Sequence, residues 1–324
     1  MRIVVIGGTG HIGTYLSPML AEAGHDVISV SRSQRQPYQP HLAWSRIAHC
    51  SLDRPLEEAR GEFAQKIAAL SADAVIDLTC YTLESARHLL EGLRGSVRHF
   101  LHCGTIWVHG HSVQVPTAED SPREPFGDYG LRKAAIENYL LATDLPVTIL
   151  HPGHLVGPGW FPINPAGNFN PEVFANLASG REVQLPNLGM ETLHHVHAAD
   201  VAAAFVQAIG AGEAAWRQSF HVVSSAALTL RGYAERVASW FGRKAVLRFL
   251  PYEEWRAHVS EKDAQITLDH IARSSNCSIE KARRLIGYEP KYSSLEAVRE
   301  SLDWLIQEGK VRVSSLSEPG VLPK

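Results

Sequence analysis

Apolar and polar positions alternate in blocks along the first half of the chain. Residues 2–6 form a continuous, mostly β-branched apolar run, which is typical of a strand buried on both faces. The glycine-rich segment 7–13 follows directly, and apolar positions within 15–20 then recur at helical spacing. Gly24 ends this helix, and 27–30 is a second apolar run. This order predicts a strand, a helix and a second strand.

The same exchange of strand and helix continues beyond residue 30. Further strands are predicted at 74–78, 99–103 and 147–150, and helices near 55–70, 84–93 and 131–142. Strands that alternate with helices are typical of parallel sheets, because the connecting helices cover the two faces. The sequence therefore predicts an α/β fold built on a doubly wound parallel sheet.

Proline and glycine crowd the twenty residues after Leu150 and interrupt regular structure there. The remaining pattern predicts helices at 171–179, 198–209, 229–241, 251–258, 278–286 and 294–307, and short strands at 183–185 and 220–223. We expect residues 1–165, completed by about 195–225, to form the sheet domain. We expect 166–194 and 226–324 to form a smaller, mostly helical region that completes the site.

Composition and charge exclude several classes of protein. The 324 residues are 45% apolar and 20% charged, so the chain can bury enough surface to fold without a partner. A net charge of −3 with no basic block argues against nucleic acid as a partner. No apolar stretch is long enough for a membrane helix, and the N-terminus lacks a signal-peptide pattern. The four scattered cysteines favour reduced thiols in the cytoplasm.

The first turn carries the spacing GxxGxxG at Gly7, Gly10 and Gly13. A dinucleotide pyrophosphate needs a main chain that can approach it closely at a helix N-terminus, and glycine leaves that room. The strand before the turn and the helix after it favour this interpretation over a tight turn without a ligand.

A second motif, YxxxK, joins Tyr129 and Lys133 at the start of a predicted helix. A spacing of four places both side chains on one helix face. A nearby ammonium lowers the pKa of a phenol and makes general acid/base chemistry possible at neutral pH. The spacing therefore predicts a proton-transferring tyrosine.

These motifs, in this order, resemble the extended branch of the short-chain dehydrogenase/reductase superfamily, which includes UDP-galactose 4-epimerase and the sugar-nucleotide dehydratases. Further likenesses lie at 100–110 (FLHCGTIWVHG), 151–159 (HPGHLVGPG), 197–202 (HAADVA) and 281–290 (KARRLIGYEP). The resemblance covers nearly the whole chain. It implies a Rossmann dinucleotide-binding domain followed by a substrate-binding region, an NAD(P) cofactor, and a homodimer formed through the helices at 84–93 and 131–142.

The resemblance also assigns roles to single residues. Thr105 falls where the family has the Ser or Thr that hydrogen-bonds the reacting oxygen, although a hydroxyl at a strand end can simply bond the main chain. Tyr129 would exchange the proton, and Lys133 would hold the nicotinamide ribose. The expected cofactor contacts are Gly7, Gly10, His11, Ile12, Gly13, Ser31, Arg32, Asp53, Leu78, Tyr129, Lys133 and Pro152.

Departures from the family pattern reduce the number of reactions and substrates that the resemblance allows. Dehydratases of this branch have an acidic pair directly after the Thr, where this chain has Ile106 and Trp107, so dehydration is disfavoured. Nucleotide-sugar enzymes place an Arg where this chain has Leu193, which puts a diphosphate substrate in doubt. Arg273 could approach from the C-terminal region, but the sequence does not place it.

Two residues are candidate substrate contacts, Trp107 and His154, with an aromatic of the core and a satisfied loop histidine as the respective alternatives. The run His194, His195 and His197 invites a metal interpretation. A strand turns alternate residues to opposite faces, and no carboxylate stands at ligand spacing, so we expect no metal site.

The end of the second predicted strand bears on the choice of cofactor. An acidic residue there binds the ribose 2′-hydroxyl of NAD, whereas a small residue followed by Arg admits the 2′-phosphate of NADP. Ser31 and Arg32, with Arg35 nearby, favour NADP over NAD. Arg32 could also lie in solvent or stack on adenine. Asp53 is a weaker candidate on the adenine side.

Two classes of function remain. The first is an NAD(P)-dependent oxidoreductase or epimerase that transfers hydride at a secondary alcohol or ketone of a small or sugar-like substrate, with a nucleotide-sugar 4-epimerase as the alternative. The second is a non-catalytic dinucleotide-binding sensor or RNA-binding relative. Such relatives typically lose part of YxxxK, which is intact here at Tyr129 and Lys133.

Overall fold

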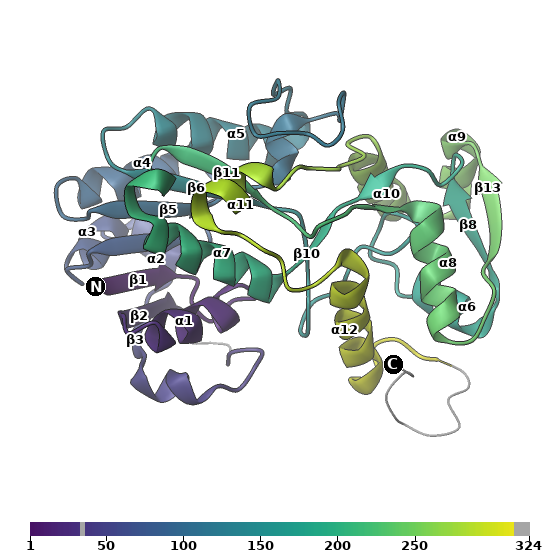
Figure 1. Cartoon of the computed structure of the whole chain (residues 1–324), viewed down its shortest axis with the longest axis horizontal. Coiled ribbons are helices and arrows are strands. Elements are labelled where there is room, and N and C mark those ends of the chain that lie inside the picture. Colours follow the sequence, from purple (N-terminus) through teal and green to yellow (C-terminus); the bar gives the residue numbers. More distant parts are fainter. Residues whose placement is uncertain (33–35, 314–324) are drawn as a thin grey trace.

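Seven parallel strands form the central sheet. The computed structural model describes residues 1–32 and 36–313 (Figure 1). The strand order is β11-β6-β5-β4-β1-β2-β3, and each neighbouring pair is parallel. These strands are β1 (Arg2–Ile6), β2 (Asp26–Ser31), β3 (Ala48–Ser51), β4 (Ala74–Asp77), β5 (His99–Cys103), β6 (Val147–Pro152) and β11 (Gln218–Val222). The predicted doubly wound parallel sheet is confirmed.

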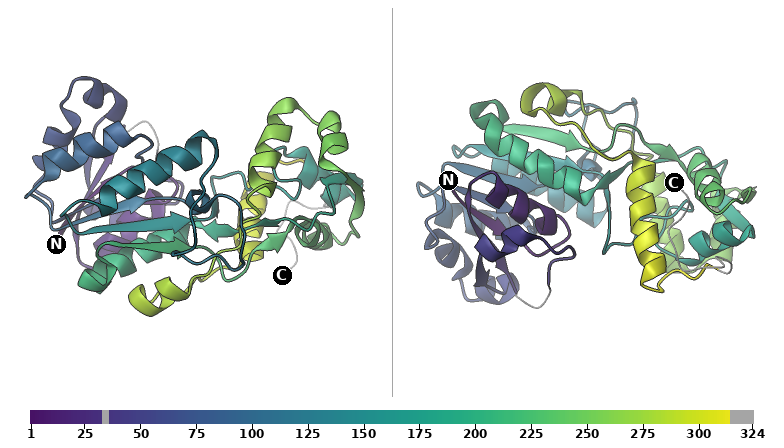
Figure 2. Two further views of the ribbon diagram at one scale, coloured as in Figure 1. Left: turned by 90° about the horizontal axis from the view of Figure 1, so that it is seen from above. Right: turned by 60° about the horizontal axis from the view of Figure 1, so that its bottom comes forward.

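Helices cover both faces of the sheet, as the left view of Figure 2 shows. One face carries α1 (Gly13–Glu22), the 3-10 helix η1 (Leu42–Arg46), α7 (Ala198–Ala211) and α11 (Glu280–Ile286). The other carries α2 (Arg54–Ala59), α3 (Phe63–Ala68), α4 (Leu83–Leu93) and α5 (Gly127–Leu141). Along β1, Val4 packs into one core and Val5 into the other, which explains the uninterrupted apolar run.

The other elements lie mostly beyond the carboxyl ends of these strands, toward the right of Figure 1. The strands are β7 (His154–Val156), β8 (Glu182–Pro186), β9 (Thr192–Leu193), β10 (His195–His197), β12 (Leu228–Thr229) and β13 (Val246–Leu250). The helices are α6 (Glu172–Ser179), α8 (Leu230–Trp240), α9 (Tyr252–Trp255), α10 (Glu261–Ile271) and α12 (Ser294–Gln307). Three further 3-10 helices are η2 (Ile106–His109), which follows β5, η3 (Gly212–Ala215), which follows α7, and η4 (Arg256–His258).

This C-terminal region has a hydrophobic core of its own, whose buried residues run from Val156 to Val311. In contrast, α11 packs against α7 and β11 and belongs to the core of the sheet. The expected domain boundaries stay a prediction, but the structure places residues 280–286 with the sheet. No helix among the described residues is long and apolar enough to cross a membrane.

Two glycines shape the turn between β1 and α1. Gly7 has a φ of 89°, and its N–H donates to the Val30 carbonyl at 2.8 Å. A Cβ at Gly7 would lie 2.6 Å from Thr79 Cγ2, and a Cβ at Gly13 would overlap the main chain of Gly7 and Gly8. The close turn at the N-terminus of α1 therefore requires glycine at both positions.

A buried ion pair lies at the carboxyl end of β4. The fully buried Asp77 accepts hydrogen bonds at 2.9 Å from Arg54 Nη1, which approaches both carboxylate oxygens. Burial alone would lower the pKa of Arg54, but the carboxylates of Asp77 and Glu58 and the nearby Cys80 raise it above its ordinary value. Arg54 is the only cation that pairs with Asp77 among the described residues, whereas Arg54 also pairs with Glu58 at 2.7 Å.

We expect Asp77→Ala to lower the free energy of unfolding by about 1.5–3 kcal/mol, since Arg54 loses one of its two carboxylate partners and keeps Glu58. The matched control is Asp26→Ala, which removes the partner of Arg2 in an exposed ion pair and should cost about 0–1 kcal/mol. Urea denaturation at pH 7 measures both. Equal losses for the two variants would show that the Arg54 pair is not stabilising.

Candidate active site

The structure brings together the three residues expected to carry the chemistry. Thr105 lies directly after β5, where it caps η2, and Tyr129 lies in the first turn of α5. The Thr105 side chain lies close enough to the Tyr129 phenol to influence its pKa. Lys133 follows one turn later, with its Nζ 6.0 Å from the centre of the Tyr129 ring. A strand end and a helix start thus place a hydroxyl, a phenol and an ammonium in one cluster.

The electrostatics of this cluster differ from the expectation for Tyr129. The residue is 42% exposed overall, but desolvation of its hydroxyl raises the pKa of the phenol, and the neighbouring Thr105 side chain only partly opposes this. The buried Lys133 Nζ donates to the Cys80 and Cys103 carbonyls, each at 2.8 Å, and burial lowers its pKa. In this structure the phenol is therefore protonated at neutral pH and is poised as a proton donor.

Three aromatic side chains, those of His11, Tyr38 and Trp160, pack together at the glycine turn. His11 stacks on Trp160, with ring centres 4.9 Å apart and planes 8° apart, and Tyr38 meets its edge at 5.8 Å. Burial and the neighbouring His197 lower the pKa of His11 to about 3, so its ring is neutral. Ile12 is buried just before α1. The predicted phosphate-binding turn thus carries a stacked, uncharged side chain above it.

The other expected cofactor residues line the carboxyl edge of the sheet. Ser31 ends β2 and the exposed Arg32 follows it, whereas Arg35 lies outside the described residues. Asp53 caps α2, its Oδ1 accepting from Leu56 N at 3.4 Å, so its side chain already has a structural role. The remaining two, Leu78 and Pro152, follow β4 and end β6. Their contacts with a cofactor stay predictions.

On the substrate side, Trp107 lies at the centre of an aromatic and cationic cluster. Its ring meets Tyr129 edge-on at 5.7 Å and His270 at 5.2 Å. The Arg273 guanidinium lies 3.7 Å from the Trp107 ring centre and 3.8 Å from that of Phe126. Trp107 thus packs beside the catalytic candidates and also against the core of the sheet, and its contact with a substrate stays a prediction.

Arg273 is the functional candidate that the sequence did not place. It is 1% exposed, donates to the carbonyls of Asp269 and Phe126, and forms no ion pair with a described carboxylate. Its Nε has no hydrogen-bond partner, and burial lowers its pKa to about 10. His270, at the end of α10, was missed as well. A cation held without a counter-ion is suited to an anionic substrate group.

His154 faces the same cluster. Its ring centre lies 5.0 Å from that of His270, and neither of its ring nitrogens has a hydrogen-bond partner. Burial lowers its pKa well below the ordinary value, so the ring is neutral. By contrast, both ring nitrogens of His194 are bonded, to Cys277 N at 3.0 Å and to the Ser224 carbonyl at 2.9 Å. His154 therefore has free bonding capacity for a substrate.

The fold and this residue set define an extended short-chain dehydrogenase/reductase. A model of the NAD dependent epimerase/dehydratase family matches residues 3–222, and the chain belongs to that family. The predicted family membership is confirmed.

Individual relatives differ in what their names say they do. Over 326 residues the chain is 25% identical to the chloroplast stem-loop binding protein of 41 kDa b of Arabidopsis thaliana, covering 96% of this chain and 81% of that protein. It is 26% identical over 332 residues to 2′-dehydrokanamycin reductase of Streptomyces kanamyceticus, and the match covers 96% of this chain and 86% of that protein. The crystal structure of UDP-glucose 4-epimerase with UDP-glucose from Thermotoga maritima is 21% identical, with a TM-score of 0.71, covering 95% of this chain and 99% of that one.

Proposed function

We propose that the protein is an NAD(P)-dependent oxidoreductase or epimerase acting on a secondary alcohol or ketone of a small or sugar-like molecule. The observation that carries this proposal is the placement of the Thr105 side chain beside the Tyr129 phenol, with Lys133 one turn along the same helix. Ile106 and Trp107 offer no proton, so dehydration is disfavoured. We further propose a cytoplasmic homodimer that pairs through α4 and α5.

The residues present fit a dinucleotide. The turn at Gly7 and Gly13 has no room for a Cβ and opens at the N-terminus of α1, where a pyrophosphate is stabilised. When bound, the cofactor supplies or accepts the hydride. In the reducing direction Tyr129 gives its phenolic proton to the carbonyl oxygen, and the Thr105 hydroxyl holds that oxygen. Lys133 fixes the loop ends at Cys80 and Cys103 through their carbonyls.

The direct test uses the purified full-length chain. Mass spectrometry of the denatured protein identifies any dinucleotide that co-purifies. NADPH and NADH oxidation is then followed over a panel of ketones and keto-sugars, alone and with nucleotide diphosphates attached. Turnover of at least one carbonyl supports the proposal, whereas absence of both dinucleotide binding and turnover overturns it.

NADP is the proposed cofactor, supported by the small Ser31 and the exposed Arg32. We expect Arg32→Ala to raise the KM for NADPH roughly 10- to 100-fold, because a charge-assisted hydrogen bond is worth about 1.5–3 kcal/mol. The KM for NADH should stay unchanged. Arg94→Ala, at another exposed arginine, is the control. Equal effects of Arg32→Ala on the two cofactors would contradict the assignment.

Arg273 favours one alternative, a nucleotide-sugar 4-epimerase. The missing Arg at Leu193 counts against a diphosphate substrate, but Arg273 offers an uncompensated cation beside Trp107. An epimerase interconverts a UDP-hexose with its 4-epimer without net change in cofactor. Chromatography of the sugar products distinguishes this outcome from net reduction.

The other class of function is a non-catalytic dinucleotide-binding sensor or RNA-binding protein. Its one support is the name of the stem-loop binding relative from Arabidopsis thaliana. The net charge of −3 gives little attraction to phosphates. A gel-shift titration with RNA hairpins at near-physiological salt tests it. Tight RNA binding together with absent turnover would replace the enzymatic proposal.

A further inference from the structure

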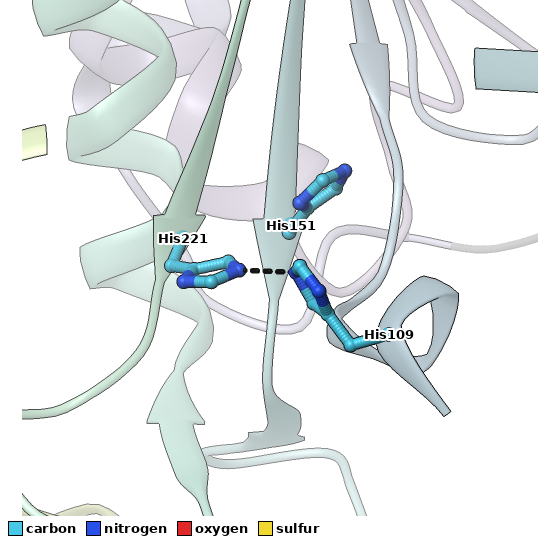
Figure 3. A group of neighbouring side chains, drawn as sticks. All are labelled: His109, His151 and His221. Atoms are coloured by element: carbon cyan, nitrogen blue, oxygen red, sulfur yellow. Dashed lines mark hydrogen bonds between the residues drawn. The ribbon is translucent and has the colours of Figure 1, made fainter. Parts of the chain in front are cut away.

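Three buried histidines that the proposed reaction does not use converge at one end of the sheet (Figure 3). His151 in β6 and His221 in β11 are register partners on neighbouring parallel strands. His109 is the last residue of η2 and closes the group from the side. The three histidines are far apart in the chain, so no sequence spacing predicts their approach.

The spacing of the ring nitrogens suits a metal ion. One nitrogen from each of the three rings lies within 4.8 Å of the other two, and His109 Nε2 is 2.7 Å from His221 Nε2. Tetrahedral zinc at about 2.0–2.1 Å from each nitrogen holds its ligands about 3.3 Å apart. Side-chain shifts on the order of 1 Å therefore convert the trio into a coordination site.

Two of the rings have the outer partners that metal-binding histidines need. His221 Nδ1 contacts the Ser278 carbonyl at 3.1 Å, which leaves its Nε2 for the centre. His151 Nε2 contacts Glu137 Oε2 at 2.6 Å, and its buried Nδ1 has no hydrogen-bond partner. Figure 3 shows one nitrogen of His151 turned toward the other rings and one turned away. In these two rings, the nitrogen that contacts the carboxylate or carbonyl carries the proton, so the other nitrogen presents its lone pair to a metal.

A surface pocket lies beside His221. It is lined by Glu119 and Ser278, among others. Glu119 Oε1 accepts a hydrogen bond from the His221 main-chain N–H at 2.9 Å, and the Ser278 carbonyl contacts His221 Nδ1 at 3.1 Å.

We propose that His109, His151 and His221 bind one divalent cation of the zinc type. Imidazole nitrogens are ligands that zinc and its d-block neighbours favour. On binding, the proton of the His109–His221 hydrogen bond moves to Nδ1 of His109, so both Nε2 atoms become ligands. The ion would hold η2 against β6 and β11, and η2 begins directly after Thr105. The site is separate from the proposed reaction and stands whether or not that reaction is found.

The test is a Co²⁺ titration of the full-length chain, made without a histidine tag and stripped of metal with a chelator. We expect visible absorption of tetrahedral Co²⁺ that saturates at one ion per chain and is abolished by equimolar Zn²⁺. If the stripped wild-type chain develops no such spectrum, or takes up Co²⁺ without saturation, the proposal is wrong. This outcome needs no variant.

Variants then assign the ligands. We expect His221→Ala to weaken Co²⁺ binding by more than about 100-fold, and Glu137→Gln by about 10- to 100-fold, as for outer partners of metal-bound histidine. The control is His99→Ala, a buried histidine of β5 that bonds Thr148 and lies outside the trio. Far-UV circular dichroism checks that each variant folds. Binding that survives in a folded His221→Ala chain would overturn the assignment.

Discussion

Tyr129→Phe is expected to lower kcat for carbonyl reduction by roughly 10²- to 10⁴-fold, the usual contribution of a positioned acid or base. The substitution removes only the hydroxyl, which lies beside the Thr105 side chain. The phenyl ring keeps its edge-on contact with Trp107, so dinucleotide affinity should change less than about threefold. Stopped-flow reduction under saturating NADPH measures the chemical step, and fluorescence titration measures affinity.

The matched control lies on the same helix. Tyr139 is partly buried in α5 and stacks with Arg87, away from Thr105. Tyr139→Phe should leave kcat unchanged. If Tyr129→Phe retains more than a tenth of the wild-type rate, the proton comes from another group, and Tyr81, which packs on Lys133 at 5.0 Å, is the next phenol to replace.

A pH profile separates two roles for the phenol. Burial raises the pKa of Tyr129, so the proton-donating form persists at neutral and mildly alkaline pH. The rate of reduction should then stay flat from about pH 7 to 9, because the donor is protonated throughout. A phenolate stabilised by Lys133 would instead make reduction fall across that range. An observed fall would restore the interpretation drawn from the YxxxK spacing alone.

The central sheet could be predicted from the sequence because its signals are local. The run at residues 2–6, the glycines that follow and the helical spacing after them lie within one short stretch of chain. The strand at 99–103 and the helix at 294–307 were predicted with their observed bounds. Helix α10 was missed, although Ser260 caps it, and this helix leads directly to Arg273.

The rest of the site depends on contacts between distant parts of the chain. Arg273 reaches Trp107 across 166 positions of sequence, and no spacing rule predicts that approach. The pKa of Tyr129 was predicted to be lowered by Lys133, but burial raises it, because desolvation depends on what packs around the hydroxyl. His151 and His221 come together through strand register, which pattern alone does not set between β6 and β11.

The second large expected effect is a loss of folding stability at acidic pH. Seven buried histidines outside the proposed metal trio have pKa values lowered mainly by burial: His11, His99, His102, His154, His194, His195 and His270. Where a value is resolved it is about 3 or about 4. In the unfolded chain each titrates near its ordinary value of about 6.5. Below that pH the unfolded chain binds more protons than the folded chain.

The stability of the protein should therefore fall steeply as pH drops from about 6.5 toward 4. A lowered histidine pKa contributes nothing above the unfolded value and progressively disfavours the folded state below it. At pH 5.5 each such group costs about 1.4 kcal/mol, and seven together about 10 kcal/mol. Domains are stable by only about 5–15 kcal/mol, so we expect unfolding near pH 5. Urea denaturation from pH 8 to 5, with a chelator present, measures the slope.

One pair of variants tests whether the buried histidines cause the loss of stability in acid. His195 is fully buried and its Nε2 lies 3.3 Å from the Ile163 carbonyl, so His195→Gln keeps a donor there without a titrating ring. It should reduce proton uptake on unfolding by about one proton between pH 6 and 5. His258→Gln, at an exposed position, should leave uptake unchanged. A wild-type chain as stable at pH 5 as at pH 7 would mean that these rings gain compensating partners on protonation, since burial alone cannot hold them neutral without that cost.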